Sequence, residues 1–173
     1  MRPEIHLIQR LPDAVRGRKW GVSATMSHGF SPLHFLVGDL YGGSMNLSYD
    51  EYELHKTVCA DGLAYLGHLN PPLILVKKTN EAQEITKLAR QLVRVADQNQ
   101  LEDLVLDHYR MLGFSKYVNP ALALPMLQGA ETTPTVSLQR IYIFADPNTY
   151  GGKNHLRDWQ RILQDSNSKY SNR

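Results

Sequence analysis

Residues 48–66 read SYDEYELHKTVCADGLAYL, and this stretch decides the expected fold because it separates two unlike parts of the chain. The segments before it are short and interrupted by turn residues, which is typical of strands and loops. The segments after it carry apolar residues at helical spacing, together with two apolar strands. Within the stretch, Leu54 and Val58 lie on one apolar stripe and Leu63 and Leu66 on another, so we predict a helix.

The beginning of this predicted helix allows two interpretations of Glu51. Ser48 and Glu51 have the spacing of a capping box, in which each side chain accepts a hydrogen bond from a backbone N–H at the start of the helix. The second interpretation is catalytic, because Glu51, His55 and Lys56 place an acid, an imidazole and an amine close together in the chain. The residues alone leave both interpretations open.

The composition indicates one globular domain. The chain has 173 residues, of which 42% are hydrophobic and 21% are charged, and this balance suits a folded protein with a substantial core. We expect the domain to cover residues 1–165 and residues 166–173 to form a mobile polar tail.

Several classes of partner find no support in the sequence. A formal net charge of +2 is too small to indicate nucleic acid, and Arg16, Arg18 and Lys19 form the only tight basic cluster, so nucleic acid is the weakest candidate partner. Cys59 is the only cysteine, which excludes a disulfide framework and a cysteine-based zinc site. The seven histidines show no metal-ligand spacing and no nucleotide-binding motif is present, so we expect neither a metal nor a cofactor.

The sequence also indicates the expected cellular location of the protein. No apolar run is long enough to span a membrane. The N-terminal segment MRPEIHLIQR is too polar for a signal peptide. We therefore expect a cytoplasmic protein without a membrane partner.

The remaining pattern predicts an α+β fold. We expect about four main helices packed on a small, mostly antiparallel sheet in a single domain, because the alternation of elements is too irregular for a doubly wound parallel sheet. The last helix should bury Trp159 and the apolar residues beside it. The predicted strands cover residues 4–11, 20–26, 33–37, 73–76 and 137–144, and the predicted helices cover 48–66, 80–97 with Asn80 as N-cap, 101–112 and the segment from Asn154, with one helical turn at 121–126.

Polar residues in loops next to helix starts form the candidate site, since loops held by a rigid scaffold usually carry function. A carboxylate near a lysine and an aromatic wall could serve glycosidic-bond hydrolysis, by stabilising an oxocarbenium-like transition state or by orienting water. The alternative for the last loop is structural, with Asn154 as the N-cap of the final helix. The loop residues in question are Phe30, Ser31, residues 51–56, and residues 146–154 with Asp146, Tyr150, Lys153 and Asn154.

The order of these pieces resembles the NADAR superfamily of N-glycosidases over most of the chain. The sequence departs from the family pattern at Tyr52, where histidine is usual, and at Tyr150, where tryptophan is usual. The most specific piece is the final Gly-Lys-Asn-x-Leu run. The matching pieces are Phe30-Ser31, Glu51 with Lys56, residues 82–90, residues 114–124, Asp146, Tyr150-Gly151, and Gly152-Lys153-Asn154-His155-Leu156.

The resemblance implies an N-glycosidase whose substrate is a small phosphorylated ribosyl compound, such as a ribosylated small molecule or an ADP-ribosyl adduct of a base. It implies catalytic roles for Glu51, Lys56 and Asp146. It also implies substrate-binding roles for Phe30, Ser31, Tyr150, Lys153 and Asn154.

A second hypothesis comes from the absence of any strong catalytic motif. The chain would then be a non-enzymatic interaction protein, either a subunit or a regulator of a larger assembly, and its partner would be another protein. The sequence does not decide between the two hypotheses. Convergence of Glu51, Asp146, Tyr150 and Asn154 on one cleft would favour the enzyme.

Overall fold

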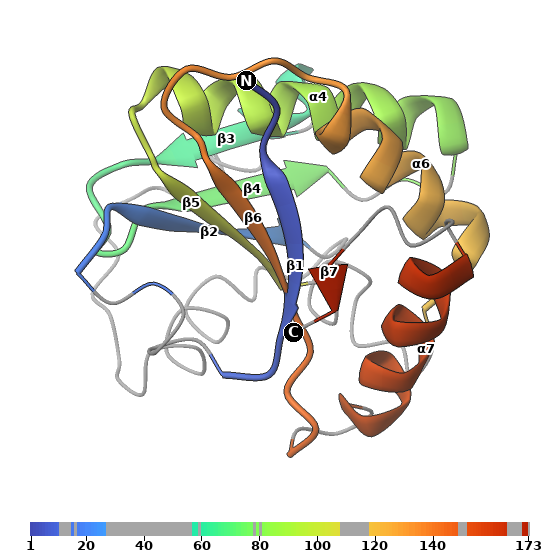
Figure 1. Cartoon of the computed structure of the whole chain (residues 1–173). Coiled ribbons are helices and arrows are strands. Elements are labelled where there is room, and N and C mark those ends of the chain that lie inside the picture. Colours follow the sequence, from blue (N-terminus) through green and yellow to red (C-terminus); the bar gives the residue numbers. More distant parts are fainter. Residues whose placement is uncertain are drawn as a thin grey trace.

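The computed structural model describes residues 1–10, 15, 17–26, 57–58, 60–77, 79, 81–107, 118–148, 152–165 and 171–172. Its strands form one seven-stranded sheet in the order β3-β4-β2-β5-β6-β1-β7 (Figure 1). The strands are β1 (Glu4–Ile8), β2 (Trp20–Met26), β3 (Leu63–Leu66), β4 (Leu73–Lys77), β5 (Asp103–Asp107), β6 (Arg140–Phe144) and β7 (Ser171–Asn172), and the long helices among the described residues are α4 (Ala82–Gln98), α6 (Pro120–Glu131) and α7 (Gly152–Asp165).

The sheet is mostly parallel, so the expected antiparallel α+β arrangement is wrong. Every neighbouring pair of strands runs parallel except β3 and β4. From β4 onward the described elements alternate between strand and helix, and such an alternation produces parallel pairs because each helix returns the chain to the starting edge of the sheet. The protein is therefore a mixed α/β protein. The sequence did not reveal this alternation because the residues of β3 and β5 were predicted to be helical.

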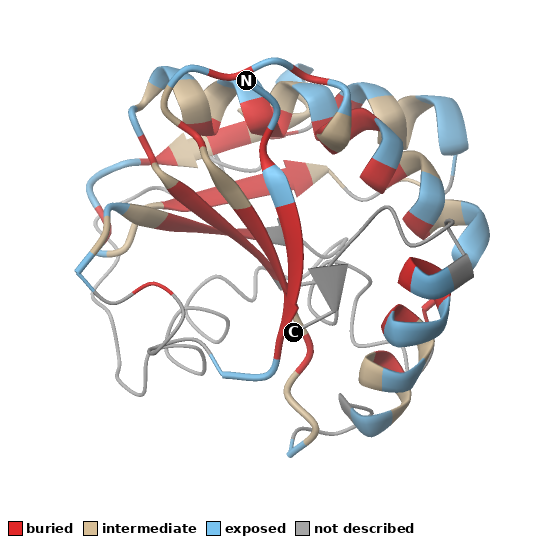
Figure 2. Cartoon of the chain, viewed as in Figure 1, coloured by how far each residue is buried: buried red, intermediate tan, exposed pale blue. Residues whose placement is uncertain are grey.

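Both faces of the sheet are buried, as parallel sheets require. Alternate residues of each strand point to opposite sides, so Ile74 and Val76 of β4 join one hydrophobic cluster while Leu73 and Leu75 join the other. The first cluster also contains the buried hydrophobic side chains of α4, α6 and α7, and α4 packs against α6. Figure 2 shows the central strands as an almost continuous buried band. The run at residues 73–76 was predicted as a buried strand, and the structure confirms it.

The predicted helix at residues 48–66 ends earlier than expected. Residues 57–58 and 60–61 are helical, but Gly62 has a φ of 86° and the next four residues form β3. A positive φ is the backbone conformation in which glycine commonly ends a helix. β3 then pairs with β4, and its Ala64 and Leu66 are buried. The part of the predicted helix before Thr57 lies outside the described residues, as does the predicted strand at 33–37.

The predicted helix at residues 101–112 is also wrong in its described part. Asp103–Asp107 is the central strand β5, which lies between β2 and β6. Leu101, Leu104 and Val105 match a helical stripe, but Leu104 and Val105 face opposite sides of the sheet. A short apolar run fits both periodicities, and here its pairing with two neighbouring strands decides.

The other helices correct the expected helix starts. α4 begins with Glu81 as N-cap, without a side-chain cap hydrogen bond, so Asn80 is not the cap. α6 is a full helix rather than one turn, and the side chain of Asn119 caps it by accepting from the N–H of Ala121 at 3.0 Å. α7 begins at Gly152, which places Asn154 inside the first turn rather than at the N-cap.

The predicted inward face of the last helix is confirmed. Trp159 is fully buried, and Ile162 and Leu163 join it in the cluster that contains the helices. Two residues of the predicted polar tail form β7, which pairs with β1 opposite His6 and Leu7. None of the described helices has the length and the apolar composition needed to cross a membrane.

Candidate functional site

The carboxyl ends of β1, β2, β4, β5 and β6 meet at one edge of the sheet because these strands run in the same direction. In Figure 1 the ends of β1 and β6 point toward the end of the molecule where α7 begins. Open α/β sheets bind their ligands at the carboxyl ends of the strands, where loops lead into helices. A ligand site is therefore expected at this edge, which we call the carboxyl edge.

Asp146 lies at the carboxyl edge, two residues beyond the end of β6. Its Oδ1 accepts a hydrogen bond from the backbone N–H of Asn148 at 2.9 Å, which is the bond of an Asx turn. The N–H of Ala145 donates to the carbonyl of Ile8 at 3.0 Å, so the loop is fixed to the end of β1 where it leaves the sheet. The half-buried Asp146 carboxylate is thus held by a short, ordered turn.

Lys153 and Asn154 lie in the first turn of α7, close to Asp146 along the chain. Lys153 is exposed and Asn154 is half-buried. The four residue steps from Asn148 to Gly152 can span at most about 14 Å, so the start of α7 stays at the same edge as the Asp146 turn. The first N–H groups of a helix have no partner within the helix and attract anions.

The structure thus brings three of the eight predicted site residues to one edge. The other five predicted site residues lie outside the described residues, so their distances from Asp146, Lys153 and Asn154 are not part of this comparison. These five residues are Phe30, Ser31, Glu51, Lys56 and Tyr150.

His155 belongs to the same region and was not singled out by the sequence as a site residue. It is buried, with 1% of its surface exposed, in the first turn of α7. It shares the buried stripe of Trp159 and Ile162, which lie four and seven positions further along the helix. The sequence feature that could have identified His155 is its spacing: it continues the apolar stripe of Trp159 and Ile162 by one helical turn, although it is polar.

A second polar cluster occupies the amino end of the sheet. Asp103 is fully buried, and its Oδ1 lies 2.8 Å from Nη2 of Arg18, which also donates to the hydroxyl of Tyr142 at 2.6 Å. Neither Asp103 oxygen has a hydrogen-bond partner of good geometry, so the short contact is an ion pair rather than an oriented hydrogen bond. Burial raises the pKa of Asp103, against the opposing effects of Arg18 and Arg140.

We assign a structural role to this amino-end cluster. The backbone N–H groups of Glu102 and Asp103 both donate to the carbonyl of Lys19. These hydrogen bonds fix Arg18 and Lys19 beside the start of β5. The cluster lies at the edge opposite the carboxyl ends of the parallel strands. Arg18, part of the only basic run in the sequence, is therefore engaged within the protein.

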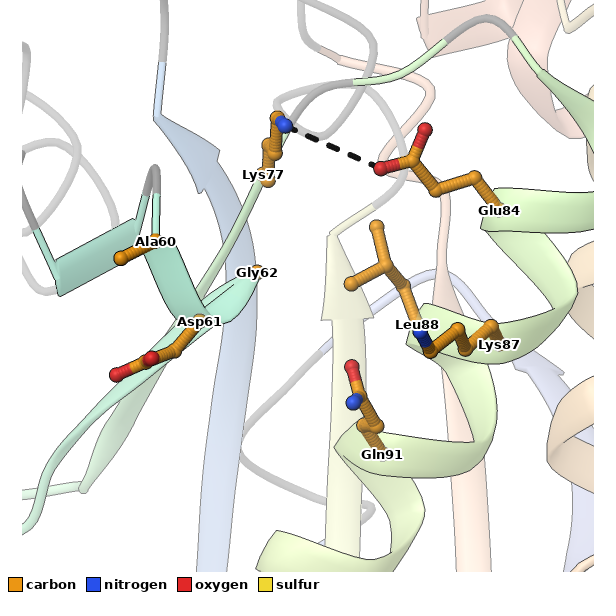
Figure 3. A pocket seen from close by; sticks show the side chains of 8 residues that line it. All are labelled: Ala60, Asp61, Gly62, Lys77, Glu84, Lys87, Leu88 and Gln91. Carbon is orange, nitrogen blue, oxygen red and sulfur yellow. Dashed lines mark ion pairs between the residues drawn. The ribbon is translucent and has the colours of Figure 1, made fainter.

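A small cavity lies near the carboxyl end of β4, beside the first turns of α4 (Figure 3). Its volume is about 130 Å³, which is roughly the space of four water molecules. Nζ of Lys77 lies 3.9 Å from Oε1 of Glu84, and the hydroxyl of Thr79 donates to the same carboxylate. Asp61 points away from α4 in this view. The lining residues are Ala60, Asp61, Gly62, Lys77, Glu84, Lys87, Leu88 and Gln91.

Four charged residues line this cavity, and two of them, Lys77 and Glu84, form a partly exposed ion pair. Three strand spacings of roughly 4.8 Å separate β4 from β6 along the carboxyl edge. No group of three or more histidine, cysteine, aspartate or glutamate side chains that could hold a metal lies within the described part of the chain.

Comparisons with known proteins support the fold and go no further. No protein-family model matches the sequence, and no curated protein matches it. The chain is similar to a solved structure named alphavirus P23pro-zbd, with a TM-score of 0.51 and 10% identity over 96% of this chain and 24% of the other. It is also similar to the macrodomain of Thermus aquaticus DarG, with a TM-score of 0.46 and 10% identity over 82% of this chain and 98% of the other.

The likeness to the alphavirus structure concerns the fold alone. The chain spans about a quarter of the alphavirus protein, and at 10% identity the similarity concerns the arrangement of helices and strands. It adds no residue to the site. The class that the fold defines is a single-sheet, predominantly parallel α/β protein.

Proposed function

We propose that the protein binds a small phosphorylated ribosyl compound at the carboxyl edge and hydrolyses its N-glycosidic bond. The observation that supports this most is the position of the Asp146 turn and the first turn of α7 at the same edge. The NADAR resemblance assigns these two segments to the substrate site. The parallel sheet gives the same segments the position in which α/β proteins bind ligands.

The chemistry divides among the residues as follows. The first backbone N–H groups of α7, with Lys153 beside them, bind the phosphate. Asp146 stabilises the positive charge that develops on the ribose as the bond to the base breaks. Glu51 activates the attacking water as general base, and Lys56 holds the glutamate or the leaving group. Phe30, Ser31 and Tyr150 enclose the base and the ribose.

Release of free base from a ribosylated pyrimidine and from an ADP-ribosyl base adduct tests this proposal. Wild-type protein should release base, and Glu51→Gln should abolish the release because an amide cannot act as a general base. Glu102→Gln, the same chemical change at the amino end of the sheet, is the matched control and should retain activity.

Two results would go against the enzyme. Equal rates for wild type and Glu51→Gln would remove Glu51 from the mechanism. If wild type neither hydrolyses nor binds any such compound, the alternative of a non-enzymatic subunit or regulator becomes the better account.

A further inference from the structure

We propose that the cavity between β4 and α4 is a binding site for a small oxyanion, the carboxylate or phosphate group of a small molecule. The cavity lies near the carboxyl end of β4, and its lining residues belong to the described part of the chain (Figure 3). The proposal rests on the walls, the size and the charges of this cavity, so it does not depend on the proposed hydrolysis.

Backbone contacts fix the walls of the cavity. Gly62 ends the short helical segment before β3 with a φ of 86°, and its carbonyl accepts from the N–H of Lys77 at 2.8 Å. α4 forms the opposite wall, where Leu88 is buried. A Cβ atom on Gly62 would come within 2.7 Å of Cδ2 of Leu88, so the turn and the helix are in direct contact. The cavity beside this contact is therefore preformed, which lowers the cost of binding a ligand.

The ion pair in the cavity is loose and leaves its lysine with capacity for a ligand. Nζ of Lys77 lies 3.9 Å from Oε1 of Glu84, whereas a charge-assisted hydrogen bond is about 2.7–2.9 Å long. The other oxygen of Glu84, Oε2, accepts from the hydroxyl of Thr79 at 3.1 Å. Thr79 therefore holds the carboxylate, and an oxyanion beside Lys77 would receive the N–H groups that Glu84 does not engage.

Two further donors line the same cavity. Among the described residues, the side chains of Lys87 and Gln91 make neither a hydrogen bond nor an ion pair. Together with Glu84 they follow at spacings of three and four along α4, so the three side chains share one face of the helix. The carboxylate of Asp61 points away from α4 (Figure 3). The groups toward α4 are thus two ammonium groups and one amide, with one carboxylate that already accepts from a hydroxyl.

This balance favours an oxyanion over a cation. Ammonium and amide N–H groups donate to the oxygens of carboxylates and phosphates. A cation would meet two positive charges and one carboxylate. The volume of about 130 Å³, roughly the space of four water molecules, suits inorganic phosphate or a short carboxylic acid and is too small for ADP-ribose. A hydroxyl beside the carboxyl group of such an acid would find an acceptor in Glu84.

The experiment titrates the full chain with inorganic phosphate and with lactate, a short hydroxycarboxylate, at constant ionic strength. The NMR signals of the backbone N–H groups of Gly62 and Lys77 and of the side-chain amide of Gln91 report occupancy, because these residues line the cavity. We expect the three signals to shift together and to saturate at one dissociation constant. The probe with the higher affinity identifies the bound group as phosphoryl or carboxyl.

Two pairs of variants with equal changes of charge separate the cavity from general attraction. Lys87→Gln removes a lining cation and should weaken binding about fivefold or more, whereas Arg94→Gln, an exposed cation two turns further along α4, should not. Glu84→Gln removes the negative charge beside Lys77 and should tighten binding about twofold or more. Asp61→Asn should change the affinity less, because its carboxylate points away from α4.

Three results would overturn the proposal. In the first, neither probe shifts the three signals, so the cavity holds only water. In the second, Lys87→Gln and Arg94→Gln weaken binding equally, so the attraction belongs to the surface as a whole. In the third, the shifts are lost in Lys153→Gln and kept in Lys87→Gln, which places the ligand at the start of α7. Thermal unfolding shows that each variant keeps the fold. Absence of base release by wild type goes against the proposed hydrolysis alone.

Discussion

The two ends of the parallel sheet use similar side chains for different purposes. At the amino end, charged groups bind the chain itself: Asp103 pairs with Arg18, and the N-terminal ammonium of Met1 donates to the carbonyl of Thr135 at 2.9 Å. At the carboxyl end, Lys153 is exposed and α7 presents its first turn. The charged groups named at the amino end are engaged within the protein, whereas at the carboxyl end Lys77 pairs with Glu84 and Lys153 is exposed.

Asp97 is the clearest example of a structural charge at the amino end. At the end of α4, its Oδ1 accepts from the backbone N–H groups of Val136, Ser137 and Leu138 at 3.0, 2.6 and 2.8 Å. Burial would raise the pKa of Asp97, but these three donors and the nearby N-terminal ammonium outweigh it and lower the pKa. The ionised carboxylate thus fixes the segment that enters β6.

The comparison predicts that loss of stability and loss of function can be separated. The largest effect on stability should come from Trp159→Ala, which empties the contact between α7 and the sheet. We expect a loss of about 3–5 kcal/mol in the free energy of unfolding, as for other large-to-small core changes. Urea denaturation measures it. A loss below about 1 kcal/mol, within the surface range, would mean that α7 is peripheral.

The next effect should come from Asp97→Ala, which leaves three backbone donors without their acceptor. We expect a loss of about 1–3 kcal/mol, since bonds to a charged group are the stronger ones and the site is partly exposed. Because the folded pKa is lowered, this stabilisation is present above the unfolded pKa of about 3.9 and is lost as the pH falls through the folded pKa. Asp97→Asn should remove that acid-dependent part, and unchanged acid sensitivity in this variant would contradict the assignment.

Asp103 should show the opposite dependence on pH. Its folded pKa is raised, so the folded protein holds the proton more tightly, and stability should decrease as the pH rises from about 4 through the folded pKa. Asp103→Asn should remove this decrease. Unfolding measured across that pH range should therefore show wild type losing stability relative to the variant. A relative gain for wild type would mean that the Arg18 ion pair outweighs burial.

The smallest effect on stability should accompany a clear loss of binding. Lys153→Ala changes an exposed side chain, so we expect the free energy of unfolding to stay within about 0.5 kcal/mol of wild type. The affinity for ADP-ribose should nevertheless fall, by about fivefold or more, because a cation at the phosphate is lost. Arg94→Ala, an exposed cation on α4, is the matched control. Equal affinity in both variants would contradict the proposal that Lys153 at the carboxyl end contributes to ligand binding.

The sequence predicted those elements whose residues carry an unambiguous local pattern. The run at residues 73–76 is apolar without interruption, and this pattern suits a strand buried on both faces. The stripe around Trp159 repeats at helical spacing over the whole of α7, and its burial is confirmed. In the candidate site, the loop–helix pattern at residues 146–154 marked a segment whose described parts, residues 146–148 and 152–154, lie at the carboxyl edge.

The errors share one physical cause. Residues 63–66 and 103–107 are short apolar runs whose spacing fits a helix and a strand equally well, and their backbone hydrogen bonds decide the outcome. Those bonds go to β4 in one case and to β2 and β6 in the other, which are distant in the sequence. The same distant pairing makes the sheet parallel and gives it a carboxyl edge.

By itself, therefore, the sequence determined where apolar surface must be buried and which segments are strongly helical, because these properties depend on residues a few positions apart. The tertiary structure alone decided the direction of the strands and which polar residues share an edge. It also decided that Arg18 is engaged with Asp103 while Lys153 faces solvent. Strand direction and charge pairing arise from contacts between segments far apart in the chain, and no local pattern encodes them.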